Sequence, residues 1–365
     1  MKNIYQIGFG LIGKTMAKDL SKNFHVHVVD INPNAFINLN NPNIIPSSFD
    51  VTKRSDLAEW LNGADLVLLA VPGFLGYKIL EMLIELEVNV IDISFSPENL
   101  LELDKKAKNK GVTVIIDAGL APGLPNLFLG HYYKENNIDS FSYYVGGLPM
   151  NPKPPFKYKA PFSPIDVIEE YTREVTQKVN GQLIKRQALT DIEERHYNNI
   201  GNLEAFNTDG LRSLIFTMKD IPNLKEKTLR FCGHANLIIE MKNKGLFNKK
   251  SIESTSQKLI EEWKLDVNEK EFTVLEIFIS SADKNTRIFL YDEFDNDSKT
   301  TSMARCTGFT ATGCVNLFNN EKNDFEFQGV VPLEVLGQNK NYFNFLIQYL
   351  NDRKIKFDIS QTSLV

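Results

Sequence analysis

The sequence feature that most constrains the fold is a glycine motif near the N-terminus, GFGLIG at residues 8–13. It follows an apolar run at residues 4–7 and precedes a stretch in which Ile12, Met16 and Leu20 recur every four residues. A GxGxxG between a strand and an amphipathic helix makes a tight turn, admits a pyrophosphate to the backbone and packs the helix onto the strand. We therefore expect a dinucleotide-binding βαβ unit, with a purely structural glycine loop as the alternative.

An acidic residue, Asp30, follows the glycine motif at the end of the next apolar run, residues 26–29. In dinucleotide-binding domains, a carboxylate about 20 residues beyond the motif accepts hydrogen bonds from the adenosine ribose. Such a carboxylate would also repel a 2′-phosphate, and here Asn32 is neutral and no arginine stands beside Asp30. The sequence therefore predicts NAD rather than NADP as the cofactor, with a purely structural turn acid as the alternative role of Asp30.

Further apolar runs at residues 66–71, 88–93 and 112–116 continue the alternation of strand and helix signals. This pattern predicts an N-terminal Rossmann domain over residues 1–125, with a doubly wound parallel sheet covered by helices on both faces. Open parallel sheets bind ligands beyond the carboxyl ends of their strands. The residues expected to contact the cofactor are Gly8, Gly10, Leu11, Ile12, Gly13, Asp30, Asp50, Val51, Ala70, Val71, Pro72, Ser94, Gly119 and Pro122.

The loop that follows the last of these runs, DAGLAPGLPN at residues 117–126, combines an acid, two glycines and two prolines. Glycines are costly to order and prolines lack a backbone N–H, so such a loop is typical of a shape held against a ligand. We expect the loop to lie under the reactive ring of the cofactor. There Asp117 would tune the nicotinamide site or only cap the loop.

After residue 126 the strand signals become longer and alternating, at residues 141–145, 182–189, 272–279 and 286–292. The last two read as a hairpin. We expect a second α+β domain with a mixed or antiparallel sheet over residues 126–305, which would bind substrate and form the dimer contact. Helical patterns at residues 308–318 and 342–350 suggest that residues 306–365 pack back on the first domain.

Composition limits the function classes. A chain of 365 residues is longer than a single hydrophobic core usually accommodates, so we expect two domains. Its net charge of −5 gives no electrostatic reason to bind nucleic acid or an anionic membrane. No apolar run approaches the roughly 20 residues that span a bilayer, and a strand at residues 4–7 argues against a secretion leader. The three cysteines form no CxxC pair, so we expect no metal site and a reducing, cytoplasmic location.

Several unusual stretches resemble the saccharopine dehydrogenase family, and most closely its bacterial L-lysine 6-dehydrogenase branch. They are GFGLIG, DAGLAPGLPN, YVGGLP, YKAPFS, LEAFNTDGL, KTLRFCGHA and GVVPLE, in family order along nearly the whole chain. The resemblance implies NAD-dependent oxidative deamination of the terminal amine of an amino acid by a homo-oligomer, a dimer. One departure, Phe231-Cys232 where the family pattern has Tyr-Pro, affects the substrate more than the reaction class.

The proposed reaction needs a proton acceptor, because hydride leaves a carbon that bears an amine readily only when the nitrogen is neutral. A lysine ε-amine has a solution pKa of about 10.4 and arrives charged. His234 follows a strand and begins a helical pattern, where the helix dipole disfavours imidazolium and keeps a neutral base. Arg230 has a fork suited to a substrate carboxylate. The alternative is that His234 caps the helix and Arg230 forms an ion pair.

Three further segments could complete the substrate site. Glu204 and Asp209 could hold an amino group, Thr208 opens a helix end that could hold a carboxylate, and capping would explain Asp209 equally well. Lys159 lies in an alternating KYK stretch and is a candidate base or carboxylate anchor, although surface lysines are usually solvated. Gly147 would let the backbone pass close to a ligand.

Three hypotheses follow for the function. The first is NAD-dependent oxidation of the ε-amine of L-lysine to allysine, which cyclises to piperideine-6-carboxylate. The second is a saccharopine or carboxynorspermidine dehydrogenase, which acts on a secondary amine. The third is a regulator that binds NAD without turnover, which would have little use for His234 beside Arg230.

Overall fold

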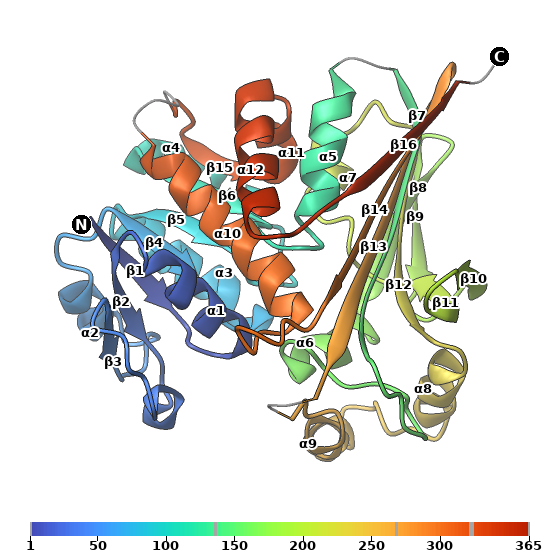
Figure 1. The fold of residues 1–365 in the computed structure, drawn as a ribbon, viewed down its shortest axis with the longest axis horizontal. Helices are drawn as coiled ribbons and strands as arrows, with labels where there is room; N and C mark the ends of the chain where they lie inside the picture. Colours follow the sequence, from blue (N-terminus) through green and yellow to red (C-terminus); the bar gives the residue numbers. More distant parts are fainter. Residues whose placement is uncertain (1, 135–136, 267–268, 321–324, 364–365) are drawn as a thin grey trace. The chain divides into compact units, whose positions relative to one another are not determined.

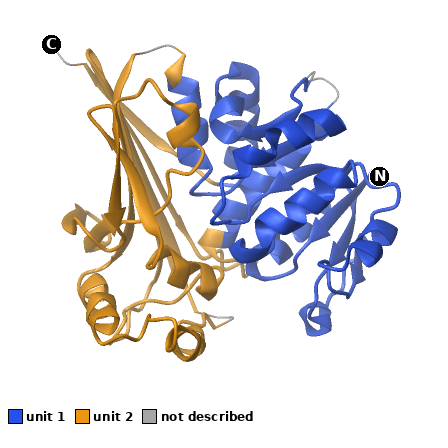
Figure 2. Ribbon diagram, turned by 180° about the vertical axis from the view of Figure 1, so that it is seen from behind, with its two compact units in different colours: residues 1–132, 304–354 blue, residues 133–303, 355–365 orange. Residues whose placement is uncertain are grey.

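The computed structural model describes residues 2–134, 137–266, 269–320 and 325–363. The chain divides into two compact units, one formed by residues 1–132 and 304–354 and the other by residues 133–303 and 355–365 (Figure 2). Within the described ranges, no helix has both the length and the apolar character needed to cross a membrane.

Unit 1 is built on a seven-stranded parallel sheet with the order β15-β6-β5-β4-β1-β2-β3 (Figure 1). Strands are added on one side of β1 up to β3 and on its other side from β4 onward, because β1 pairs with both β2 and β4. This order confirms the predicted doubly wound Rossmann sheet. The strands are β1 (Asn3–Ile7), β2 (His25–Val29), β3 (Ile44–Ser47), β4 (Leu66–Leu69), β5 (Asn89–Asp92), β6 (Thr113–Ile116) and β15 (Gly329–Pro332).

The helices of unit 1 bury apolar stripes against this sheet, and the strands β4 and β6 are buried along their whole length, as parallel strands covered on both faces should be. The predicted helices at residues 308–318 and 342–350 are confirmed as parts of α10 and α12. The elements are α1 (Leu11–Leu20), α2 (Arg54–Trp60), α3 (Gly73–Glu85), α4 (Asp104–Lys110), α5 (Leu124–Tyr133), α10 (Ser302–Asn319), α11 (Leu333–Gly337), α12 (Lys340–Asp352), and the 3-10 turns η1 (Pro33–Phe36) and η2 (Leu100–Leu103).

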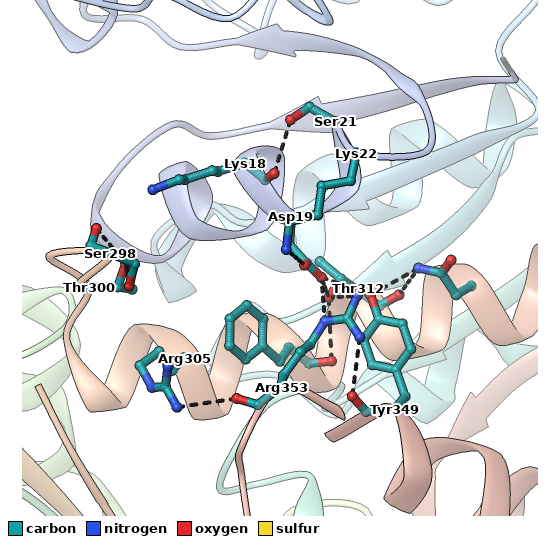
Figure 3. Close-up of polar contacts among 12 residues, drawn as sticks. Lys18, Asp19, Ser21, Lys22, Ser298, Thr300, Arg305, Thr312, Tyr349 and Arg353 are labelled. Atoms are coloured by element: carbon teal, nitrogen blue, oxygen red, sulfur yellow. Dashed lines mark hydrogen bonds and ion pairs between the residues drawn. The ribbon is translucent and has the colours of Figure 1, made fainter. Parts of the chain in front are cut away.

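A buried carboxylate ties the C-terminal helices of unit 1 to its first helix (Figure 3). Oδ2 of Asp19 in α1 accepts hydrogen bonds from Thr312 of α10 at 2.9 Å, from Tyr349 of α12 at 2.8 Å and from Arg353 at 2.8 Å. Oδ1 accepts a further bond from Lys22 at 2.9 Å. Burial would raise the pKa of Asp19, but the hydrogen bond and charge of Arg353, with the bonds from Lys22 and Tyr349, lower it below its usual value.

Unit 2 is built on a mixed sheet, which confirms the predicted second α+β domain. The main path is β10-β11-β12-β7-β13-β14-β16, and β8 pairs with both β12 and β9. Only β12 and β7 pair in parallel; the other described pairs are antiparallel. The strands are β7 (Ile138–Pro149), β8 (Glu174–Val179), β9 (Gln182–Gln187), β10 (Glu193–Tyr197), β11 (Gly201–Asn207), β12 (Asn223–Phe231), β13 (Glu271–Ser281), β14 (Lys284–Glu293) and β16 (Asp358–Ser363).

Unit 2 differs from the sequence-based expectations in three local features. The KYK stretch forms no strand, and Lys157 lies in the left-handed region with a φ of +52°. The helix expected after residue 210 is a single turn, α7 (Leu214–Thr217). The last residues pair as β16 with β14, so the C-terminal segment contributes to both units. The other helices are α6 (Pro164–Glu170), α8 (His234–Asn243) and α9 (Ile252–Glu262).

Candidate dinucleotide and catalytic sites

Each glycine of the motif in unit 1 has a separate structural role, as the spacing predicts. Gly8 has a φ of +100°, and a side chain there would place its Cβ 2.2 Å from the Ala70 carbonyl oxygen. A Cβ on Gly13 would lie 2.4 Å from the Gly8 oxygen, so this glycine is required for helix packing. Gly10 has no atom within 4 Å of its Cβ position, and no side chain caps the α1 helix that begins after it. This open, donor-rich turn is suited to a pyrophosphate.

The peptide unit between Gly8 and Phe9 is held at both ends. The side-chain amide of Gln6 donates to the Gly8 oxygen at 2.8 Å and to the Gly13 oxygen at 2.9 Å. At the other end, the Phe9 N–H donates to Oδ2 of Asp30 at 2.8 Å. Gln6 was not singled out from the sequence, although a glutamine inside the apolar run IYQI is the signal that could have identified it.

Asp30 lies half-buried at the carboxyl end of β2, beside the glycine loop. Its Oδ1 accepts the N–H of Asn32 at 2.9 Å, and among the described residues no lysine or arginine forms an ion pair with it. Each carboxylate oxygen keeps a second lone pair for another donor. The carboxylate therefore presents an uncompensated negative charge where an adenosine ribose would lie.

At the other strand ends of unit 1, some of the predicted cofactor-binding residues already have partners within the protein. Ala70 donates to the Ile7 oxygen at 2.8 Å and precedes Val71 and Pro72, which leads into α3. Ser94 is buried, and its N–H and hydroxyl both bond to Asp92. Hydrogen bonds from the hydroxyl and N–H of Thr52 lower the pKa of Asp50, whose Oδ1 is thus used within its own turn. Of the other predicted residues, Leu11 and Ile12 are the first two residues of α1, and Val51 is partly buried against the core.

The proline-rich loop after β6 has a fixed internal structure. Asp117 is buried and has a φ of +53°. Gly119 and Gly123, which flank Pro122, approach so closely that a Cβ on Gly123 would lie 1.9 Å from the Gly119 oxygen. Oδ1 of Asn126 accepts the Gly123 N–H at 3.1 Å, and its amide donates to Glu334 at 3.0 Å. The loop therefore keeps one shape, as its composition suggests.

In unit 2, His234 begins α8, as predicted, and is fully enclosed. Its Nδ1 lies 2.9 Å from the Phe156 carbonyl oxygen, and its Nε2 lies 3.0 Å from the Tyr171 hydroxyl. A carbonyl can only accept, so Nδ1–H donates and Nε2 accepts from Tyr171. Burial and the nearby charge of Arg230 lower the pKa of His234 to about 3. The imidazole is neutral, and both of its nitrogens are occupied.

Arg230 lies next to His234 in the same cluster. Its Nε donates to the Tyr171 hydroxyl at 2.8 Å, and a second nitrogen donates to the Leu229 oxygen at 2.9 Å. The guanidinium also lies 4.3 Å from the centre of the Tyr158 ring and 3.4 Å from Oε2 of Glu170. Its charge is therefore buried and balanced within unit 2.

The remaining substrate-site candidates have strong internal partners. Glu204 accepts the N–H groups of Gly233 at 2.8 Å and Ala235 at 2.5 Å, so it caps the start of α8 from the neighbouring strand β11. Thr208 lies 2.8 Å from both oxygens of Glu226. Burial raises the pKa of Asp209, although two nearby arginines act against this shift.

Two predicted residues, Lys159 and Gly147, have partners outside this cluster. The Lys159 ammonium donates to the Glu262 oxygen at 2.9 Å. A Cβ on Gly147 would lie 2.6 Å from Met303 and 2.7 Å from Pro161, so side chains already fill the space beside it. The structure thus joins His234 and Arg230 through the Tyr171 hydroxyl. It connects Thr208 to Arg230 through Thr228 and Glu170, neither of which the sequence singled out.

Together, the parallel sheet with its acid-clamped glycine loop and the mixed sheet of unit 2 define a two-domain dinucleotide-binding protein. Residues 4–115 match the saccharopine dehydrogenase NADP binding domain, and residues 119–355 match the saccharopine dehydrogenase C-terminal domain. The chain therefore belongs to the saccharopine dehydrogenase family, as its motifs suggest.

Individual relatives agree with this assignment. Mitochondrial alpha-aminoadipic semialdehyde synthase of Bos taurus is 28% identical over 221 residues, which are 57% of this chain and 24% of that protein. The NADP(+), L-glutamate-forming saccharopine dehydrogenase of Saccharomyces cerevisiae is 27% identical over 158 residues, 40% of this chain and 35% of that protein. This chain thus covers about a quarter of the first curated relatives that it matches.

A solved structure shares the fold over the whole chain. Apo saccharopine dehydrogenase (L-Glu forming) from Saccharomyces cerevisiae superimposes with a TM-score of 0.79 and 16% sequence identity. The match covers 99% of this chain and 100% of that chain. At this identity the likeness establishes the common fold.

Proposed function

We propose that this protein is a pyridine-nucleotide-dependent dehydrogenase that oxidises the carbon–nitrogen bond of a lysine-derived amine. The observation that carries the proposal is the glycine loop of unit 1, open at Gly10 and clamped by Asp30, in a chain of the saccharopine dehydrogenase family. Gly10 and the start of α1 would hold the pyrophosphate, and Asp30 the adenosine ribose. The bound nicotinamide would accept the hydride.

We infer that the cofactor is NAD. The family description names NADP, but a 2′-phosphate would need a cation where Asp30 places a negative charge. The segment after Asp30, INPNAF at residues 31–36, contains no lysine or arginine to neutralise that phosphate. These residues support NAD as the better fit.

We propose the ε-amine of L-lysine as the substrate, with saccharopine as the alternative. The names of the relatives favour the alternative, because they include saccharopine dehydrogenases that form L-glutamate. The motif resemblance favours lysine, whose single carboxylate needs fewer cationic partners than saccharopine does. Arg230, the cation that the sequence suggested as an anchor, is already balanced by Glu170 and the tyrosines, which supports the substrate with less negative charge.

We also infer that His234 positions Tyr171 rather than accepting a substrate proton, because its only acceptor nitrogen already receives the Tyr171 hydroxyl. The proton acceptor is therefore a different residue of unit 2. A homodimer in the cytoplasm remains our expectation for the assembled protein, and sedimentation of the purified chain would test the dimer.

The test is a steady-state assay that follows the absorbance of the reduced nicotinamide. NAD and NADP are each paired with L-lysine, L-ornithine, simple diamines and saccharopine. Reduction of NAD by lysine supports the proposal, whereas reduction by saccharopine alone selects the alternative. Dinucleotide binding without reduction by any of these amines would indicate a regulator and contradict the enzyme assignment.

The cofactor preference is tested separately with Asp30→Asn. A hydrogen bond to a charged acceptor contributes about 1.5–3 kcal/mol. Its loss should therefore lower the NAD/NADP ratio of kcat/KM by roughly tenfold to a hundredfold. Asp56→Asn removes an exposed carboxylate of α2 and is the matched control, for which the ratio should not change. An unchanged ratio in Asp30→Asn would contradict the role given to this carboxylate.

A further inference from the structure

Two carboxyl groups of unit 2 are joined by a chain of two threonine hydroxyls. Thr228 donates to Oε1 of Glu170, the last residue of α6. The hydroxyls of Thr228 and Thr208 lie 2.8 Å apart, and Thr208 lies 2.8 Å from both oxygens of Glu226. Glu226 and Thr228 stand two residues apart in β12 and share one face of the strand.

Counting hydrogens shows that this chain contains a carboxyl proton. Each hydroxyl has one hydrogen, but the two threonines take part in three contacts between groups: Thr228 with Glu170, Thr228 with Thr208, and Thr208 with the Glu226 carboxyl group. When Thr228 donates to Glu170, Thr208 must donate to Thr228, and the remaining contact then needs a hydrogen on Glu226. The reversed direction needs a hydrogen on Glu170 instead. One of the two carboxyl groups is therefore protonated whenever all three contacts are hydrogen bonds.

The surroundings place this proton on Glu226. Burial and the nearby charge of Glu170 raise the pKa of Glu226 well above its usual value, although hydrogen bonding with Thr208 and with the Gly210 N–H acts in the opposite direction. Arg230 faces Glu170 at 3.4 Å and places its positive charge beside that carboxylate.

The other groups around the pair agree with this assignment. The acid Asp209 adds to the negative charge around Glu226. Arg173 and Arg212 act on Asp209 instead, and Tyr143 donates to the Gly210 oxygen. Burial strongly raises the pKa values of Tyr158 and Tyr171, which lie beside Arg230, so both hydroxyls stay neutral.

We propose that Glu170 is the proton acceptor for the substrate amine, and that protonated Glu226 orients the two threonine hydroxyls toward it. Glu170 is the solvent-reached end of the chain, with 13% of its side chain exposed, whereas Glu226 is fully buried. The role in amine oxidation rests on the proposed function; the shared proton does not.

The proton balance of the step is closed. An N–H bond of the substrate ammonium breaks and an O–H bond forms on Glu170, which leaves the electron pair on nitrogen. That pair would form the C=N bond with the carbon that bears the amine, and a bound nicotinamide would accept the hydride, with its two electrons, from that carbon. Glu170 then releases its proton to solvent, and Glu226 keeps its own proton throughout.

The shared proton is tested first, without turnover, on the full chain. Carbon-13 NMR of glutamate carboxyl groups, or infrared spectroscopy, should show a protonated carboxyl at neutral pH that disappears in Glu226→Gln. A spectrum with no protonated carboxyl signal that Glu226→Gln removes would overturn the proposal; a signal that persists in this variant belongs to another group, such as Glu271, whose pKa burial raises to about 7. This result is independent of whether lysine, saccharopine or no amine is oxidised.

Activity assays then test the acceptor with the amine that the wild type oxidises. Glu170→Gln should lower kcat by roughly a hundredfold or more while dinucleotide affinity stays unchanged. The matched control is Glu169→Gln, its neighbour in α6, which pairs with Arg173 and should keep wild-type kcat. Wild-type kcat in Glu170→Gln would overturn the assignment.

The hydroxyl chain has its own readout, the pH profile of kcat/KM. Thr228→Val removes a donor that stabilises the negative charge of Glu170, so the acid limb should move up by about one pH unit. Thr228→Ser keeps the hydroxyl and should restore the wild-type profile. A profile unchanged in a folded Thr228→Val protein would show that the threonines are only structural.

Discussion

At the scale of single residues, Gln6 shows how a buried side chain can shape the glycine loop although it lies outside that loop, in β1. Its amide holds the carbonyls of Gly8 and Gly13 inside the unit. The Gly8–Phe9 peptide must then point its N–H the other way, toward Asp30. Asp30, which we propose binds the ribose, and Gln6, which shapes the loop, are therefore connected through one peptide bond.

Replacing Gln6 by leucine should weaken dinucleotide binding by about tenfold, because two hydrogen bonds of about 1 kcal/mol each are lost and two carbonyls stay buried. The value of kcat at saturating dinucleotide should change much less, since Gln6 acts only through the loop. Isothermal titration and steady-state kinetics would measure the two effects.

A matched control is Gln177→Leu in unit 2, where a buried glutamine donates to Asn207 at 2.7 Å. It should lower stability without changing dinucleotide affinity. Equal loss of affinity in both variants would mean that Gln6 contributes only general stability.

At the scale of secondary structure, α8 shows how one element positions the start of another. Glu204 of β11 pairs with Arg230 of β12 in the sheet register and caps the first N–H groups of α8. The periodicity after residue 233 predicted this helix and its start at His234. The prediction of a strand at the KYK stretch was wrong, because three alternating residues are too few to define a strand and Lys157 has a left-handed backbone.

Glu204→Ala should lower the free energy of unfolding by about 1–2 kcal/mol, because the substitution leaves two helix N–H groups without their acceptor. Urea denaturation followed by circular dichroism would measure the loss. In the control, Glu240→Ala, an exposed residue of the same helix changes, and the expected effect is within about 0.5 kcal/mol. Equal effects would contradict the capping role.

At the scale of the whole molecule, the chain visits each unit twice. After β14 it returns to unit 1 through α10, β15 and α12, and it then adds β16 to the sheet of unit 2. The Asp19 carboxylate holds the returning segment against α1, because it accepts hydrogen bonds from Thr312 and Arg353, about 300 positions later in the chain. A long loop closed by one buried ion pair makes that pair important for stability.

Arg353→Gln should destabilise unit 1 by about 3 kcal/mol, because it leaves the buried charge of Asp19 with only the exposed Lys22 as a cationic partner. Lys22→Gln removes an exposed partner of the same carboxylate and should cost under about 1 kcal/mol. The pKa of Asp19 is lowered in the folded state, so its contribution is complete above the unfolded value of about 3.9 and is lost as the pH falls through the folded value.

Thermal unfolding of both variants from neutral to acid pH would check this prediction. The difference between Arg353→Gln and the wild type should shrink at low pH, where protonated Asp19 no longer needs its cation. A difference that stays constant with pH would place the effect of Arg353 outside the ion pair.

The sequence alone determined the parallel sheet, the glycine loop with its acid, the mixed second sheet and the family, because these follow from local periods and from residues a few positions apart. Only the tertiary structure decided which donors reach Asp19, which carbonyls Gln6 holds, and that Thr208 and Thr228 join Glu226 to Glu170. The strand β12, NLKEKTLRF, shows the physical reason: alternation tells which side chains share a face, whereas their hydrogen-bond partners come from elements far away in the chain.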